Sequence, residues 1–148
     1  YLDERIPDPP MLPPKLAARA KARELSRFHD TRLEPELRKL FALFSPADRN
    51  PAISAAQSTA LSARLVQLAR MLPARDESTV DGPMLADCGF PISFVWIDAL
   101  TPILGLTVTW PKEVLSYRER IEQHPAIADE VADYRIKLID YLAQRTAP

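Results

Sequence analysis

The segment from Phe90 to Leu106 constrains the fold most, because it is apolar on almost every side. It reads FPISFVWIDALTPILGL, and its only polar breaks are Ser93, Asp98 and Thr101. A helix that is hydrophobic all round has no face to turn toward water, so other elements must surround it. We therefore predict that this segment is the central helix of a helical bundle.

A membrane span is the alternative for this segment. The apolar run is short for a span, carries Asp98 at its centre, and is interrupted by Pro91 and Pro102. A charged side chain in the middle of a bilayer is unfavourable, and a buried bundle helix tolerates one more easily at its edge. We expect no membrane partner.

The chain before this segment divides into a linker and a long helix. From Asp3 to Pro14 it has five prolines among twelve residues, which cannot continue a helix. From Lys15 to Phe44 apolar residues recur every three to five positions, which predicts an amphipathic helix. Pro35 removes one backbone donor, so we expect a kink just before it, starting near residue 31.

Three further helices are predicted around the central one. Leucines spaced by four, three and four residues indicate a helix over Ile53–Leu72, which Pro73 ends. A polar loop is expected at residues 74–83. A short helix follows Pro111 and ends at His124, and a final one begins near Ile127. No segment alternates as a strand does, so the predicted fold is all-α, with about five helices.

Composition excludes several classes of function. The 148 residues suit one domain, and the net charge of −1 and the lack of a basic run argue against a nucleic-acid partner. One cysteine, two histidines and three glycines exclude a disulfide framework, zinc spacing and a glycine-rich phosphate loop. The single cysteine favours a cytoplasmic location, and the excess of Arg over Lys is typical of GC-rich bacterial genomes.

Three stretches of the chain resemble the C-terminal domain of cytosolic glutathione S-transferases. They are YLDERIPDPPMLPP from Tyr1, GPMLADCGF from Gly82, and WPKEVLSYRERIEQHPAI from Trp110. The resemblance implies that residues 1–14 are the end of an N-terminal domain and a Pro-rich linker, and that residues 15–148 are the helical domain. Because the chain begins with Tyr1 rather than Met, we expect a fragment of a longer chain or a processed product.

The resemblance also implies a division of labour in the parent enzyme. The thioredoxin-like N-terminal domain, which this sequence lacks, would carry the catalytic group that activates glutathione. The helical domain would form a wall of the hydrophobic electrophile pocket and part of a homodimer interface. Glutathione would be a co-substrate, with no other cofactor and no metal. This domain alone is therefore expected to have no catalytic residue and no activity.

Five residues are candidates for binding. Asp30 resembles an acid that several transferase classes use across the dimer to bind the γ-glutamyl amine of glutathione, a sensible charge pair. Glu34, Leu37 and Phe41 share its helix face and are candidates for binding the electrophile, as is Trp110. The alternatives are a solvated acid at Asp30 and plain core packing for the apolar residues.

Other polar residues are weaker candidates. Asp87 is predicted to cap the first turn before the central helix, in a capping box whose usual Ser or Thr is replaced by Met84. Ser26 and His29 lie three residues apart, as a nucleophile and a base would, but no orienting acid can be named. Cys88 is expected to be an inert core residue rather than a reactive thiol.

Two other functions stay open at this stage. The chain is alternatively a non-catalytic, transferase-like module for protein interaction, or a bundle with no site. The sequence before Tyr1 would distinguish an enzyme from a docking module, because a βαβ pattern with an early Ser, Cys or Tyr favours the enzyme.

Overall fold

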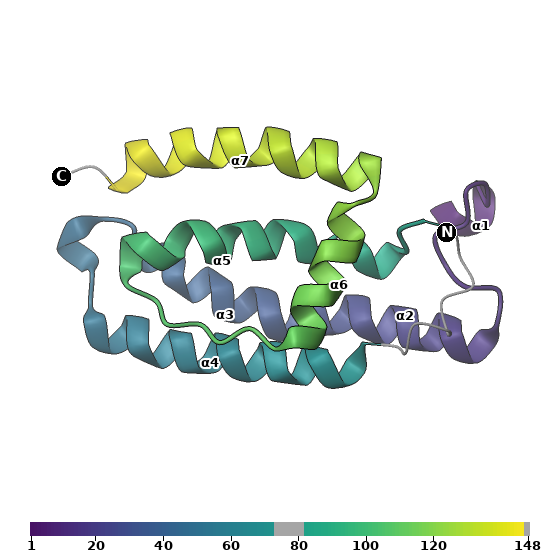
Figure 1. Cartoon of the computed structure of the whole chain (residues 1–148), viewed down its shortest axis with the longest axis horizontal. Coiled ribbons are helices and arrows are strands. Elements are labelled where there is room, and N and C mark those ends of the chain that lie inside the picture. Colours follow the sequence, from purple (N-terminus) through teal and green to yellow (C-terminus); the bar gives the residue numbers. More distant parts are fainter. Residues whose placement is uncertain (73–81, 147–148) are drawn as a thin grey trace.

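The fold is all-α, as the sequence predicts. The computed structural model describes residues 1–72 and 82–146, and those residues form helices and no strand (Figure 1). The predicted polar loop lies mostly outside the described residues. The longer helices are α2 (Leu16–Phe28), α4 (Pro51–Met71), α5 (Phe90–Leu104), α6 (Lys112–Glu122) and α7 (Pro125–Thr146). The short ones are α1 (Leu2–Arg5), the π-helical η1 (His29–Leu33), α3 (Glu34–Arg38), and the 3₁₀ turns η2 (Lys39–Leu43), η3 (Pro46–Asp48) and η5 (Leu85–Asp87).

Helix α5 is the central element, and the other helices pack around it. It contacts α7 on one side and α3 on another, while α6 crosses it steeply and also touches α4 and α7 (Figure 1). Eight of its residues are buried, including Phe90, Phe94 and Ile97, which are fully enclosed. This confirms the prediction of a buried central helix, because an all-apolar surface is stable only when neighbours cover it.

The central helix ends two residues earlier than the sequence predicts. Gly105 adopts a left-handed conformation with φ of 61°, and the backbone N–H groups of Gly105 and Leu106 both donate to the carbonyl of Thr101. A glycine in this conformation is a common helix terminator. By length and composition the stretch Leu85–Leu104 could cross a membrane, but half of it is buried inside the protein, and a core helix passes the same test.

The first long helical segment changes geometry where Pro35 predicts a kink. Helix α2 ends at Phe28, η1 forms a π-helical turn, and α3 follows. The N–H of Glu34 donates to the carbonyl of His29, five residues back, which is the π-helical pattern. Because proline has no N–H to continue α-helical bonding, the chain accommodates it with a wider turn.

Helix α4 supports the loop that leaves α5. Asn50 caps its N-terminus by accepting from Ala52 N–H at 3.0 Å. On its inner face, the hydroxyls of Ser58 and Ser62 accept hydrogen bonds from the N–H groups of Thr107 and Thr109, at 3.0 and 2.9 Å. Buried polar groups need such partners, which explains why serines lie on the buried side of this helix.

Candidate functional site

Two of the four buried polar residues among those described, Asp87 and Ser93, lie at the N-terminal end of α5. Asp87 is 1% exposed, and its two carboxylate oxygens have separate donors. Oδ2 accepts from the backbone N–H of Met84 at 2.8 Å, and Oδ1 accepts from the hydroxyl of Tyr117 at 2.6 Å. Asp87 thereby caps η5 and also fastens α6 to the start of the central helix.

Tyr117 was not singled out by the sequence analysis. Burial of its hydroxyl, followed by the negative charge of Asp87 and the hydrogen bond to it, raises the pKa of Tyr117 well above its ordinary value. The phenol therefore stays neutral and acts as a donor. Tyr117 is buried together with Val114 and Ile121 on one face of α6, and the structure adds a polar role that this spacing does not reveal.

A second polar row lies beside this end of α5, on the π-helical turn. His29 Nδ1 lies 2.8 Å from Asp30 Oδ1, and His29 Nε2 lies 2.8 Å from Ser93 Oγ. The Asp30 side chain is 64% exposed, the His29 side chain is 12% exposed, and Ser93 is buried. The row therefore runs from the interior of the bundle to an exposed carboxylate.

The imidazole of His29 is held in one place by its surroundings. It packs edge-on against Phe90, with ring centroids 5.1 Å apart and an interplanar angle of 77°. Gly89 lies against the ring so closely that an added Cβ would be 2.7 Å from two of its atoms. Only glycine leaves enough room for the ring here.

The hydrogen-bonding capacities of the three groups indicate which atoms donate. An ionised carboxylate can only accept, so His29 Nδ1–H donates to Asp30. In the neutral ring Nε2 is then an acceptor, and the hydroxyl of Ser93 donates to it. The row thus links a buried hydroxyl, an imidazole and a surface carboxylate through two hydrogen bonds.

The order Asp, His and Ser is also that of a serine hydrolase triad, but this row lacks the access that hydrolysis needs. Ser93 is 4% exposed, and its neighbours Phe90 and Phe94 are fully enclosed. A nucleophilic oxygen must be reachable by a substrate carbonyl. The exposed functional group of the row is the carboxylate of Asp30, and the structure pairs His29 with Ser93 rather than with Ser26.

The remaining predicted binding residues do not gather around Asp30. Glu34 forms an ion pair with Arg38, one turn along the helix. Leu37 is 2% exposed and belongs to the core. Phe41 is partly buried and packs on Trp96, with ring centroids 4.7 Å apart.

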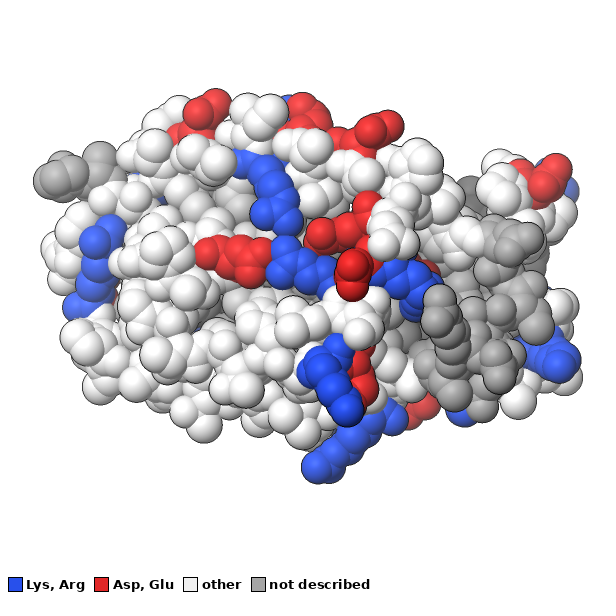
Figure 2. Space-filling model, viewed as in Figure 1, with Lys and Arg blue, Asp and Glu red and all other residues white. Residues whose placement is uncertain are grey.

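Trp110 contacts α5 and α6. It is partly buried, makes an edge contact with Phe94 at 5.2 Å, and lies under the guanidinium of Arg118 at 5.5 Å. Arg118 also bonds Asp98 at 2.6 Å and Glu122 at 2.9 Å, which explains how the charge of Asp98 is tolerated on the central helix. Figure 2 shows acidic and basic side chains interleaved where α6 crosses the molecule.

An apolar cavity of about 420 Å³ opens beside the start of α5. Of the residues proposed from sequence as site or capping residues, Asp87 alone lines it. The cavity lies between the Pro-rich segment, the beginning of α5 and the beginning of α7. Its lining includes Pro9, Pro10, Met11, Pro91, Ile92 and Ile127.

Cys88 lines this cavity, so the expectation that it is a core residue is wrong. The residue is exposed, although its thiol is partly desolvated. That desolvation, followed by the charge of Asp87, raises the pKa of Cys88 above its ordinary value. The thiol is therefore a poor nucleophile. The sequence also predicted an unreactive thiol, but on the ground that Cys88 would be buried in the core.

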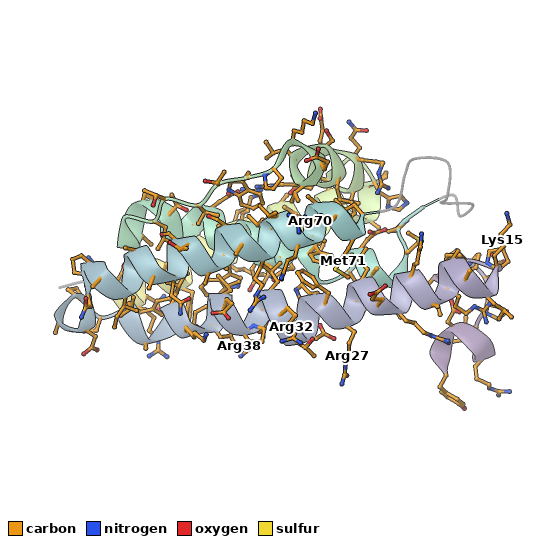
Figure 3. All side chains as sticks on the ribbon, turned by 90° about the horizontal axis from the view of Figure 1, so that it is seen from below. Lys15, Arg27, Arg32, Arg38, Arg70 and Met71 are labelled. Atoms are coloured by element: carbon orange, nitrogen blue, oxygen red, sulfur yellow. The ribbon has the colours of Figure 1, made fainter. Side chains whose placement is uncertain are left out.

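Several arginines lie along the first helical segment and α4. Figure 3 shows the line of α2 and α3 lying alongside α4, with Arg27, Arg32 and Arg38 on the first and Arg70 on the second. Arg27, Arg32 and Arg70 are exposed. An anionic group near Arg27 or Arg32, which flank Asp30 in the sequence, would be attracted by their positive charge, whereas the charge of Arg38 is offset by Glu34.

Within residues 1–72 and 82–146, no group of three His, Cys, Asp or Glu side chains could hold a metal ion. No protein-family model matches this chain, and neither the curated proteins nor the solved structures give a significant match.

Proposed function

We propose that this chain is the helical domain of a bacterial, homodimeric glutathione transferase. In the intact enzyme a preceding domain would bind glutathione and generate its thiolate, which attacks a soft electrophile. This domain would hold the ligands close together, so that attack is nearly intramolecular. The supporting sequence features are the three stretches that resemble the family, and the supporting structural feature is the all-helical arrangement around a buried central helix.

The observation that carries the proposal is the exposed carboxylate of Asp30, held by His29. One oxygen is fixed by the imidazole, and the 64% exposure of the side chain leaves the group open to an outside donor. The γ-glutamyl ammonium of glutathione bound to the partner subunit is such a donor, and a charge-assisted hydrogen bond would form. The neighbouring arginines suit the two carboxylates of the same tripeptide.

The apolar cavity is assigned to contact with the preceding domain rather than to the electrophile. Its wall is built partly by Pro9, Pro10 and Met11, in the segment that the resemblance identifies as the linker. The N–H of Leu85 donates to the carbonyl of Met11 at 2.8 Å, which fixes this segment beside η5. A domain joined through that segment would lie next to the cavity.

The test is the kinetics of the intact polypeptide that carries these residues. Initial rates of conjugation of 1-chloro-2,4-dinitrobenzene are measured while glutathione is varied. Asp30→Asn should raise the KM for glutathione by about tenfold or more, because a hydrogen bond to a charged group contributes about 1.5–3 kcal/mol. The matched control is Asp140→Asn, which changes an exposed acid on α7.

Two outcomes would contradict the proposal in different ways. An unchanged KM in Asp30→Asn, with normal conjugation by the wild type, would remove Asp30 from glutathione binding. A wild-type protein that neither binds glutathione nor conjugates it would overturn the transferase function and favour the non-catalytic interaction module.

A further inference from the structure

We propose that His29 is a positioning residue that fixes the Asp30 carboxylate for its ligand, and that buried Ser93 anchors the imidazole from the interior so that His29 can do so. The inference rests on the proposed function, because it concerns the same carboxylate. It assigns roles to two residues, His29 and Ser93, that the resemblance does not supply.

The first step is that His29 and Asp30 are unusual partners. Side chains one residue apart on an α-helix do not face each other. Here they meet at 2.8 Å, at the point where the helix changes from α2 to the π-helical η1. Single π-helical turns are frequent at functional sites, where the altered backbone redirects side chains.

The second step is that the ring has little freedom. Ser93 bonds it from the interior, Gly89 admits it by lacking a Cβ, and Phe90 packs on it edge-on. An exposed aspartate without a partner would populate several rotamers and lose that freedom on binding a ligand. Because the His29 ring is already fixed, its hydrogen bond restricts the rotamers of Asp30 before a ligand binds. Pre-organisation of this kind lowers the entropy lost on binding and so strengthens it.

The third step concerns charge. The Asp30 carboxylate only accepts, so Nδ1 carries a proton, and in the neutral ring Nε2 is left to accept from the Ser93 hydroxyl. This tautomer donates to Asp30 without adding a positive charge. The carboxylate therefore keeps its full negative charge for an ammonium group, whereas a lysine or arginine at position 29 would neutralise it.

The kinetic test compares variants of His29 in the intact enzyme. His29→Ala should raise the KM for glutathione about fivefold, the usual effect of one lost hydrogen bond, with little change in kcat. His29→Asn should recover most of the loss, because its amide can donate from the position of Nδ1. The matched control is His124→Asn, which changes the other histidine of the chain.

A double variant separates positioning from general destabilisation. If His29 acts through Asp30, then Asp30→Asn combined with His29→Ala should bind glutathione no worse than Asp30→Asn alone. Additive losses would overturn the inference. So would a raised KM in Asp30→Asn together with a normal KM in His29→Ala, a result that leaves the proposed function standing. A normal KM in Asp30→Asn overturns both.

A spectroscopic measurement tests the role of Ser93 without any turnover. Nitrogen-15 chemical shifts of the two histidine rings in the 148-residue chain report which nitrogen carries the proton. His29 should be in the Nδ1–H form at neutral pH, and Ser93→Ala should change the Nε2 shift and broaden the ring signals, because the ring loses its interior anchor, while the helical content is retained. A proton found on Nε2 in the wild type would overturn the assignment.

Discussion

Asp87→Ala tests how much the buried carboxylate of Asp87 stabilises the fold, because it accepts hydrogen bonds from both η5 and α6. The substitution removes the cap on the Met84 N–H, which costs about 1 kcal/mol. It also leaves the hydroxyl of Tyr117 buried without an acceptor, and an unsatisfied buried donor costs about 2 kcal/mol. We expect the free energy of unfolding to fall by about 3 kcal/mol.

The same substitution should be milder when Tyr117 is phenylalanine. In the Tyr117→Phe background no hydroxyl is left unsatisfied, so Asp87→Ala should remove only the cap, about 1 kcal/mol. Asp87→Asn in the wild-type background should lower the free energy of unfolding by less than Asp87→Ala does. The amide can still accept from Met84 N–H, and its NH₂ group can donate to the phenol oxygen. The difference between the two backgrounds measures the bond between Asp87 and Tyr117.

The assay is urea unfolding of the chain, followed by far-ultraviolet circular dichroism. With a urea slope of about 2 kcal/mol per molar, a loss of about 3 kcal/mol moves the midpoint by about 1.5 M. Asp140→Ala, at an exposed position of α7, controls for loss of an acid as such. A loss below about 1 kcal/mol, or an equal loss in both backgrounds, would refute the reasoning that the buried hydroxyl depends on Asp87.

Two further predictions follow from the same end of α5. Because burial raises the pKa of Tyr117 in the folded state, folding keeps the phenol neutral, and the stability it contributes is present below about pH 10 and lost as the pH rises through the folded-state pKa. Urea unfolding at about pH 9 and about pH 11 should therefore show a larger alkaline loss for the wild type than for Tyr117→Phe, and equal losses would contradict this sign. Gly89→Ala places a Cβ 2.7 Å from the His29 ring and should destabilise by about 1–3 kcal/mol. Since Gly89 has an ordinary helical φ of −88°, a matching loss in the His29→Ala background would show that the ring is not the cause.

The central helix was predictable because its signal does not depend on a partner. A segment apolar on every side must be enclosed, whichever elements do so, and α5 is enclosed. The C-terminal end of this helix was not predictable from composition alone, because the apolar run continues as far as Leu106. The chain stops the helix at Leu104 because Gly105 turns left-handed, and the side chain of Leu106 still reaches the core from outside the helix.

The position of the irregular turn in the first helical segment was predictable from the sequence, but its π-helical geometry was not. Pro35 removes one donor wherever it stands in a helix, so a departure from α-helical bonding near it follows from covalent structure. Whether the departure is a sharp kink or a wider turn depends on what packs against it. Here Leu33 is fully buried beside α4, and η1 keeps it there while letting His29 reach α5.

The pairing of His29 with Ser93 could not be predicted from local spacing, because 64 residues separate them. Spacing along one helix can identify only neighbours on that helix, and it therefore pointed to Ser26 as the partner of His29. A weaker signal was present on the central helix: Gly89 precedes Ser93 by one turn, in a stretch where the other inward positions carry Phe, Val and Ile. A glycine and a small hydroxyl residue on one face of such a helix leave a gap between the larger side chains, with a hydroxyl group at its base. A flat ring with a hydrogen-bonding atom at its tip fits that gap, and in the first helical segment His29 is the side chain of that shape.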